Sequence, residues 1–489
     1  MISHPKFTFG KIRFHALVGI FVSAVLLSHA QSPVTIQLDP KKAGATIAPD
    51  FVGLSFEMQY VLASTNGYHF FSPENKPLIA TFKTLGIKNL RVGGNTADRP
   101  TIPTPKEADV DSLFAFAKAA DVKIIYTLRL NQGSLDAATQ MANYITRHHA
   151  KQLTCFAIGN EPNVFSKEYA PYLAEWKRYV AQITAPTNSP GAKFCGPSTS
   201  PGHETWARDF ANEFGNHGPL AFISQHDYPG GDARRATNTV AARDKILSPA
   251  IDDHYKTFSA NFVPAILSNS LPYRLEEANS YYDGGALDVS DTFASALWAL
   301  DYQWWWASHG ASGINFHTGD KVAARDENKP CRYAVFWTSP EGYNVHPIGY
   351  GLKMFSLGAH GSLLPVTAEN PENLNLAVYA TARDNYAIRV TLINREHGSS
   401  SRAAIIKLDP GIPNAHATAM FLMTTNGDIS AKTGITLGRA EIQDNANWDG
   451  KWTSLTKSTE GGQFVFTLPA SSAALVTITP NARAIRDFK

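Results

Sequence analysis

Two glutamates stand where short apolar runs of the chain end. Glu161 closes a run that begins at Leu153, and Glu277 closes the run Tyr273–Glu277, with loop-forming residues after each. The carboxyl end of a buried parallel strand is where an α/β barrel places its catalytic groups. Two carboxylates facing one cavity suit glycosidic bond hydrolysis, because one protonates the leaving oxygen while the other attacks the sugar carbon. Asn160, next to Glu161, is placed to donate to the sugar 2-hydroxyl.

The elements that would position this pair alternate regularly along the chain. Eight short apolar runs are predicted strands: Val52–Glu57, Asn89–Gly93, Lys123–Leu130, Leu153–Gly159, Lys193–Gly196, Ala221–His226, Tyr273–Glu277 and Gly313–His317. Helical patterns lie between them, at Leu78–Leu85, Ala108–Ala120, Ser134–His148, Lys167–Thr184 and Thr292–Ser308. This alternation predicts parallel strands with helical crossovers, and eight units over roughly 300 residues fit a (β/α)8 TIM barrel. A doubly wound open sheet is the alternative fold.

Polar side chains stand at the end of each predicted strand. In chain order they are Glu57, Arg91 with Asn95, Arg129 with Asn131, Asn160 with Glu161, Ser198, His226 with Tyr228, Glu277, and His317. An open sheet does not explain so many polar strand ends, whereas a barrel gathers them in one cup. The pattern therefore favours the barrel and predicts a single polar site.

The pattern changes after Gly361 to short alternating strands separated by turns. The predicted strands are Asn375–Ala382, Tyr386–Asn394, Ala403–Leu408, Ala417–Thr424, Phe464–Leu468 and Ala474–Ile478. They predict an antiparallel β-sandwich over residues 363–489 that packs against a barrel at 50–362. The run Val34–Asp39, within residues 31–49, is expected to join that sandwich.

Residues 1–30 have the character of a secretory signal peptide. Lys6, Lys11 and Arg13 precede an apolar stretch, and the small residues around Ala30 offer a cleavage site. The alternative is a membrane anchor, but the apolar stretch is shorter than the ~20 residues that span a bilayer. We expect a secreted or periplasmic protein without stable membrane insertion after cleavage.

The charge of the chain limits its partners. The formal net charge of +2 becomes about −1 once the three basic residues of the predicted signal peptide are removed. A protein that holds nucleic acid or a long sulfated polyanion is expected to be much more basic. The charge thus argues against a nucleic-acid partner and favours a small or terminal-residue substrate.

Cysteine usage and motif content predict no cofactor or metal. The three cysteines do not make a disulfide framework, and Cys155 and Cys195 read as buried thiols, although a bridge between them is possible if their strands are neighbours. There is no Cys/His cluster with zinc spacing and no glycine-rich phosphate loop.

The residues around both glutamates resemble a known clan. Asn160-Glu161-Pro162 on the fourth strand, with Glu277 on the seventh, resembles the retaining barrel glycosidases. The segment Glu277–Gly285 further resembles glycoside hydrolase family 79, the β-glucuronidases and heparanases. In that family, a tyrosine five residues beyond the nucleophile and the following glycines line the pocket for the uronate carboxylate, and Tyr282 and Gly284 occupy those places. The resemblance covers the barrel and the sandwich.

The resemblance implies a role for each matching residue. Glu161 corresponds to the general acid/base and Glu277 to the nucleophile, with carboxyls ~5–5.5 Å apart. Glu276 competes for the second role, but side chains alternate along a strand and the spacing to Tyr282 favours Glu277. The resemblance implies further substrate contacts from Glu57, Asn95, Asn160, Tyr228, Tyr282, Gly284, His317 and Tyr333. Tyr350 is the alternative to Tyr333.

Two features need the structure to interpret them. Asp283 stands where some family members have a glycine whose N–H meets the uronate, and an inward carboxylate there would repel the substrate. Trp304, Trp305 and Trp306 lie in a predicted helix and are expected to pack in the core, whereas Trp337 is the candidate for stacking on the leaving sugar.

Taken together, the resemblance implies a secreted retaining exo-β-glucuronidase acting on terminal glucuronic acid or its 4-O-methyl form. Three alternatives stay open. They are a heparanase-like endo-β-glucuronidase, another barrel-clan glycosidase acting on neutral sugars, and a carbohydrate-binding barrel without catalysis. The last has no need for an acid and nucleophile pair.

Overall fold

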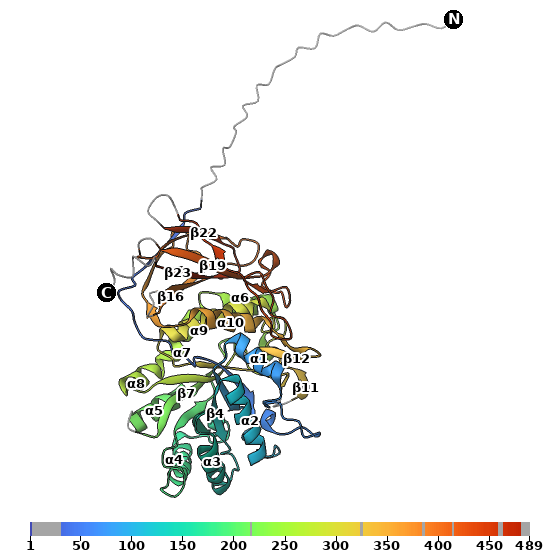
Figure 1. Cartoon of the computed structure of the whole chain (residues 1–489), viewed down its shortest axis with the longest axis vertical. Coiled ribbons are helices and arrows are strands. Elements are labelled where there is room, and N and C mark those ends of the chain that lie inside the picture. Colours follow the sequence, from blue (N-terminus) through green and yellow to red (C-terminus); the bar gives the residue numbers. More distant parts are fainter. Residues whose placement is uncertain are drawn as a thin grey trace.

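The computed structural model describes Met1 and residues 31–215, 218–322, 326–383, 387–412, 415–457 and 463–480 (Figure 1). Apart from Met1, the predicted signal peptide lies outside the described residues, as does Tyr386 at the start of one predicted strand. None of the helices in the described ranges has the length and hydrophobicity that a bilayer crossing requires.

Eight parallel strands close into a barrel, which confirms the predicted fold. They are β2 (Val52–Glu57), β3 (Asn89–Gly93), β4 (Lys123–Leu128), β5 (Leu153–Ile158), β6 (Phe194–Thr199), β7 (Leu220–Asp227), β8 (Tyr273–Ala278) and β9 (Ile314–His317). Their ends lie within three residues of the predicted ends, because buried parallel strands are continuous apolar runs that turn residues interrupt.

Helices cover the outside of the barrel. They are α1 (Lys76–Leu85), α2 (Glu107–Ala120), α3 (Leu135–His149), α4 (Tyr169–Ile183), α5 (Glu204–Phe214), α6 (Thr239–Leu247), α7 (Ile251–Ala260), α8 (Val263–Ser268), α9 (Phe293–Ser308) and α10 (Pro347–Gly358). Short 3-10 turns stand at η1 (Met58–Val61), η2 (Pro162–Val164) and η4 (Ala233–Arg235). Helix α1 shows why the predicted helices begin and end where they do. The Asn75 side chain accepts a hydrogen bond from the Leu78 N–H, and Gly86 ends the helix at φ 77°.

Two packed sheets form the second unit, as predicted. One sheet has the order β15 (Val366–Glu369), β1 (Val34–Leu38), β18 (Ala404–Asp409) and β22 (Phe464–Leu468). The other contains β14 (Ser362–Leu364), β16 (Leu376–Ala382), β17 (Ile388–Asn394), β23 (Ser472–Thr479), β19 (His416–Met423) and β20 (Thr436–Leu437), with β21 (Thr453–Ser454) paired to β19. The N-terminal run joins the first sheet as expected, parallel to β18 and antiparallel to β15.

Helices α9 and α10 lie between the barrel and the sheets (Figure 1). Trp304, Trp305 and Trp306 on α9 are all buried, which confirms their predicted packing role. Trp304 stacks on Tyr379 of β16 with ring centroids 5.5 Å apart. Asp301 accepts hydrogen bonds from the Tyr379 hydroxyl at 2.9 Å and from Arg395 Nη1 at 2.7 Å. The two units therefore share one apolar and ionic interface.

Asp301→Ala is expected to lower the free energy of unfolding by about 3–5 kcal/mol, because it leaves the buried Arg395 guanidinium without its main counter-charge. Urea unfolding followed by circular dichroism measures this loss. Asp253→Ala is the control, since it removes one partner of an exposed pair with Lys256 and is expected to change nothing measurable. Equal effects of the two substitutions would contradict an interface held by the buried pair.

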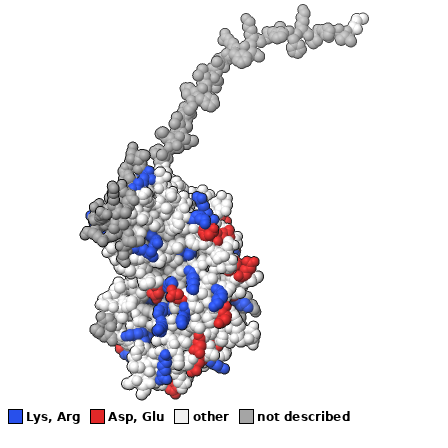
Figure 2. Space-filling view, viewed as in Figure 1, with Lys and Arg blue, Asp and Glu red and all other residues white. Residues whose placement is uncertain are grey.

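Two short hairpins border the carboxyl end of the barrel. They are β10 (Lys321–Val322) with β11 (Asp326–Pro330), and β12 (Phe336–Ser339) with β13 (Gly342–Val345). Both follow β9 in the chain. On the face shown in Figure 2, basic and acidic side chains are interspersed rather than gathered in one band.

Candidate active site

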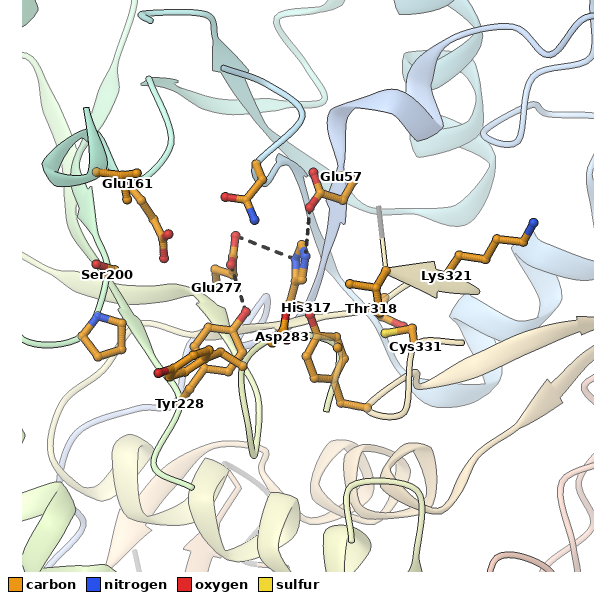
Figure 3. Close-up of a pocket in the computed structure, with 17 residues that line it drawn as sticks. Glu57, Glu161, Ser200, Tyr228, Glu277, Asp283, His317, Thr318, Lys321 and Cys331 are labelled. Atoms are coloured by element: carbon orange, nitrogen blue, oxygen red, sulfur yellow. Dashed lines mark hydrogen bonds and ion pairs between the residues drawn. The ribbon is translucent and has the colours of Figure 1, made fainter. Parts of the chain in front are cut away.

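A cavity of about 380 Å³ opens at the carboxyl end of the barrel (Figure 3). Nine of the ten predicted site residues line it: Glu57, Asn95, Glu161, Tyr228, Glu277, Tyr282, Gly284, His317 and Tyr333. The tenth, Asn160, is buried beside the cavity and contacts Arg91. The barrel thus brings together side chains that are spread over nearly 280 positions of the sequence, as the strand-end pattern predicts.

The two predicted catalytic glutamates face each other across this cavity. One oxygen of Glu161, one oxygen of Glu277 and a ring nitrogen of His226 all lie within 4.8 Å of one another. In Figure 3 the Glu161 carboxylate points toward Glu277. Glu161 adopts φ 45° and ψ 57° in the turn after β5, a left-handed conformation that is uncommon for a glutamate and directs its side chain into the cup.

Glu277 is surrounded by hydrogen-bond donors and cations. Its Oε2 accepts from Arg91 Nη1 at 2.6 Å, and its Oε1 accepts from the Tyr228 hydroxyl at 2.9 Å. The ring nitrogen Nδ1 of His317 lies 3.8 Å from Oε2. Burial alone raises the pKa of this carboxyl, but the charges of His317, His226 and Arg91 outweigh it and hold the pKa well below its usual value. Glu277 is therefore an anion at neutral pH.

Arg91 connects the two halves of the site and was not among the predicted site residues. It is fully buried, and besides Glu277 it donates to Ser55 Oγ at 3.1 Å and to Asn160 Oδ1 at 2.6 Å. The Asn160 amide oxygen is thereby occupied, which leaves its NH₂ group as the donor expected for a sugar hydroxyl. The signal was an arginine inside an otherwise apolar strand, since such a charge needs a buried partner.

Glu57 and His317 form the wall opposite Glu161. Glu57 Oε2 accepts from the Thr96 N–H at 2.7 Å and from the Thr96 hydroxyl at 2.6 Å, and its Oε1 lies 3.7 Å from His317 Nε2. A Cβ on Gly94, where φ is 64°, would lie 2.5 Å from Glu57 Oε2. Only glycine therefore allows the turn after β3 to pass so close to this carboxylate.

Strand β8 carries a bulge that the sequence did not indicate. From Arg274 to Glu277 it advances three residues, while its neighbour β7 advances two, from Ser224 to His226. The extra residue breaks the alternation of side chains, so Glu276 and Glu277 both lie inside the barrel wall. Glu277 lines the cavity as predicted, whereas Glu276 is fully buried and contacts Ser198 and Cys195. The spacing to Tyr282 favoured the glutamate that lines the cavity, but the strict alternation of side chains expected for this strand does not hold here.

The third wall contains the tyrosine and glycines of the family resemblance. Tyr282 borders the cavity with its ring packed edge-on against Tyr228 at 6.2 Å, and Gly284 follows at φ 83°. A side chain on Gly284 would overlap Val322 of β10. Tyr333 lines the cavity, whereas the Tyr350 hydroxyl accepts from the Ile442 N–H outside it, so the structure places Tyr333 rather than Tyr350 at the site.

Asp283 lines the cavity, but cations face its charge. Its Oδ2 lies 3.5 Å from Arg234 Nε and 3.8 Å from Lys329 Nζ. An anionic ligand beside Asp283 would therefore meet these two cations together with the carboxylate. Trp337 is not among the residues that line the cavity, and its Nε1 donates to the Cys331 carbonyl at 3.2 Å. Its predicted stacking on a sugar is not supported by this position.

Glu161, His226 and Glu277 are close enough to share a metal ion, but their environment does not suit one. The Arg91 guanidinium already occupies Glu277 at 2.6 Å. Burial lowers the pKa of His226, but Glu277, Glu161 and Glu276 together raise it to about 9, so the imidazole is protonated at neutral pH. A protonated imidazole and a guanidinium repel a metal cation.

Cys155 and Cys195 are both free thiols.

Comparison with known proteins agrees with this fold. No protein-family model matches the sequence. The chain is 24% identical over 371 residues to a β-glucuronidase of Aspergillus niger, in an alignment that spans 62% of this chain and 63% of that relative. The solved 4-O-α-L-rhamnosyl-β-D-glucuronidase of Fusarium oxysporum 12S superposes with a TM-score of 0.69 at 21% identity, covering 91% of this chain and all of that one.

A family 51 arabinofuranosidase of Xanthomonas axonopodis pv. citri gives a TM-score of 0.67 at 14% identity, again with 91% of this chain and 100% of that chain covered. Identities this low establish the fold and nothing finer. The shared fold is a closed parallel TIM barrel with an attached β-sandwich, and both of these solved structures are glycoside hydrolases. The sequence similarity is to a curated β-glucuronidase.

Proposed function

We propose that the protein is a retaining exo-β-glucuronidase of the family 79 type, which releases terminal β-linked glucuronic acid or its 4-O-methyl form. The observation that carries the proposal is the approach of Glu161 and Glu277 in one cup, with oxygens no more than 4.8 Å apart. Carboxyls this close correspond to a retaining pair, because inverting enzymes keep theirs ≈ 6.5–9.5 Å apart to admit a water molecule.

The proposed reaction has two displacements. In the first, Glu277 attacks the anomeric carbon while Glu161 gives its proton to the glycosidic oxygen, so that the aglycone leaves as an alcohol. In the second, Glu161 takes a proton from water, the water oxygen attacks the same carbon, and Glu277 is released. Arg91 and Tyr228 hold Glu277 in place, and Asn160 binds the sugar 2-hydroxyl. Glu57, Asn95 and His317 bind further hydroxyls.

The uronate preference is proposed from the wall formed by Tyr282, Gly284 and Tyr333. The tyrosine hydroxyls and the backbone N–H of this segment are donors for a carboxylate. Arg234 and Lys329, which neighbour Asp283, reduce the repulsion that Asp283 would otherwise exert. The similarity to the Aspergillus niger β-glucuronidase supports the same substrate class.

The exo mode of action is proposed from the size of the cavity. About 380 Å³ is near the lower end for ligand pockets, which suits one terminal sugar better than a polymer cleft. The Fusarium oxysporum neighbour was solved with a rhamnosyl-glucuronic acid complex, so a 4-O-substituted glucuronide is a second substrate to test.

The N-terminal sequence further supports export, and N-terminal sequencing of the mature protein tests cleavage near Ala30.

Initial rates on 4-nitrophenyl β-D-glucuronide, beside the matching glucoside and xyloside, test the substrate class. We expect a clearly higher initial rate on the glucuronide than on the glucoside or the xyloside. Turnover of a neutral glycoside instead would agree with the proposed mechanism but contradict the proposed uronide substrate. Cleavage of internal bonds in heparan sulfate or hyaluronan, without release of terminal glucuronate, would establish the endo alternative. Ligand binding without any turnover would indicate a carbohydrate-binding barrel.

Tyr282→Phe is expected to lower kcat/KM for the glucuronide about tenfold and to leave the weaker neutral-glycoside activity unchanged. The reason is that it removes one hydrogen bond to the uronate, worth about 1.5 kcal/mol, while the ring that packs on Tyr228 stays. Rates on both substrates measure the difference. An equal change on both would show that Tyr282 does not recognise the carboxylate.

Tyr228→Phe is expected to reduce kcat/KM by about tenfold to a hundredfold, because the hydroxyl stabilises the ionised form of Glu277 from 2.9 Å. Losing that hydrogen bond raises the pKa of Glu277, so the acidic limb of the pH–rate profile should move to higher pH. A uniform loss at every pH would indicate a packing role only. Tyr350→Phe, which lies outside the cavity, is the matched control.

A further inference from the structure

Glu276 is a fully buried carboxylate that the proposed reaction does not use. It follows Arg274 and Leu275 in the bulged part of β8 and lies beside the nucleophile without lining the cavity. Its oxygens accept from the Ser198 hydroxyl and, at 3.3 Å, from Cys195 Sγ. A buried ionised carboxylate is costly unless a cation compensates it. The nearest cationic partner is the imidazole of His226, whose Nε2 lies 3.7 Å from Glu276 Oε1.

The other ring nitrogen of that imidazole, Nδ1, lies next to the two proposed catalytic glutamates. His226 Nδ1 lies 3.1 Å from Glu161 Oε1 and 4.0 Å from Glu277 Oε1. Nδ1 is within hydrogen-bonding distance of Glu161, whereas the buried Nε2 makes no hydrogen bond and meets Glu276 at ion-pair distance. Carboxylates beside both nitrogens favour the doubly protonated ring, which agrees with the raised pKa of His226. His226 thus bridges Glu276 below the cup to Glu161 within it.

We propose that Glu276 is a positioning residue for the acid/base: it orients His226 so that Nδ1 meets Glu161, and it balances the positive charge that His226 brings to the site. The inference rests on the proposed role of Glu161. An uncompensated imidazolium beside Glu161 would favour loss of the very proton that the first step requires. With Glu276 ionised, the His226 and Glu276 pair is electrically neutral, and Glu161 receives a hydrogen bond without a net positive neighbour.

Charged and titratable groups from several strands surround this pair, among them the Cys195 thiol on β6 and the Arg274 guanidinium on β8. The others lie nearer the cavity. They are Glu57 on β2, Arg91 on β3, Glu161 after β5, His226 on β7, Glu277 on β8 and His317 on β9. The carboxyl of Glu276 has a pKa of about 2, because His226, Arg91 and Ser198 together outweigh its burial. Removing its negative charge makes proton loss easier from every group in this coupled cluster.

Glu276→Gln tests the proposal, because it keeps the shape and removes the charge. The readout is kcat/KM against pH, with whichever 4-nitrophenyl glycoside the wild-type enzyme hydrolyses. We expect the basic limb to move by about one pH unit toward acid, with little loss on the acidic side. Glu276→Asp keeps the negative charge, so its basic limb should lie close to that of the wild-type enzyme. Cys195→Ser, which changes a packing partner of Glu276 without changing charge, should leave the limb in place.

A basic limb that stays in place, or a loss that is equal at all pH values, would overturn the proposal. Since any hydrolysed glycoside serves, a wrong uronide assignment leaves the test intact. If no glycoside is hydrolysed, thermal unfolding against pH decides. The raised pKa of His226 stabilises the fold fully below about pH 6.5 and ceases to do so as pH rises through about 9. In Glu276→Gln that loss should occur at lower pH, and identical curves would contradict the proposal.

Discussion

Glu277→Gln is expected to lower kcat/KM by about four orders of magnitude, while the protein stays folded. The amide fills the same space but is not a nucleophile, so no glycosyl–enzyme intermediate can form. Arg91 then faces a neutral group, although Glu57 and the Asn160 amide oxygen remain nearby. Initial rates on 4-nitrophenyl β-D-glucuronide, together with a thermal unfolding curve, measure both parts of this expectation.

The neighbouring Glu276→Gln is the matched control, because it removes a carboxylate one residue away that does not line the cavity. At pH values below its shifted basic limb, Glu276→Gln should retain most of the wild-type kcat/KM. A smaller residue at the nucleophile position, Glu277→Gly, should regain turnover with added azide and yield the α-glycosyl azide, since azide enters from the vacated face. Full activity of Glu277→Gln, or a loss of activity only in Glu276→Gln, would show that Glu277 is not the nucleophile.

Glu161→Ala is expected to slow the enzyme by an amount that depends on the leaving group. With phenyl β-D-glucuronide, whose leaving oxygen needs a proton, the loss in kcat/KM should reach about 10²–10⁴-fold. With the 2,4-dinitrophenyl glycoside, which departs without protonation, the loss should be far smaller. Steady-state kinetics on both substrates measure the contrast.

Product analysis gives an independent check on Glu161. Azide should react with the glycosyl–enzyme of Glu161→Ala from the face where Glu161 stood and give the β-glycosyl azide, the opposite anomer to that from Glu277→Gly. Glu57→Gln is a suitable comparison, because it neutralises a third carboxylate in the cavity whose proposed role is binding. Equal losses on both leaving groups would show that Glu161 does not supply the proton.

Much of the fold could be predicted from this sequence. Parallel strands buried on both faces appear as apolar runs, and the predicted barrel strands agree with the structure within three residues. Helix α10 (Pro347–Gly358) was not among the predicted helices, because it is buried on nearly every side and lacks a polar face that would reveal a helical period. The short helices α5 to α8 were also not among them.

The site could be predicted less completely than the fold. Strand ends identify the cup, but not how far each side chain turns into it. The bulge in β8 has no signature in the residues Leu275 to Glu277, since it arises from pairing with neighbouring strands. His226 was noted at a strand end without a role. Tyr228 follows directly after β7, and the two-residue spacing between His226 and Tyr228 is the signal that directs both side chains to the same side of the barrel.

The contacts of Asp283 depend on loops that follow different strands, and the choice between Tyr333 and Tyr350 depends on how the segment after β9 folds back over the barrel. No pattern within one segment determines which loop side chains meet, so packing settled both points. The cation partners of Asp283, Arg234 and Lys329, come from segments about 50 residues before and after it. Such long-range pairs carry no local sequence signal.

Covalent trapping of the glycosyl–enzyme identifies the nucleophile. The enzyme is incubated with 2-deoxy-2-fluoro-β-D-glucuronyl fluoride, whose fluorine slows the second displacement, and the labelled peptide is identified by mass spectrometry. We expect one label per chain, on Glu277, with loss of activity in step with labelling. A label on Glu161 or Glu276, or continued turnover with an inverted product and no label, would contradict it.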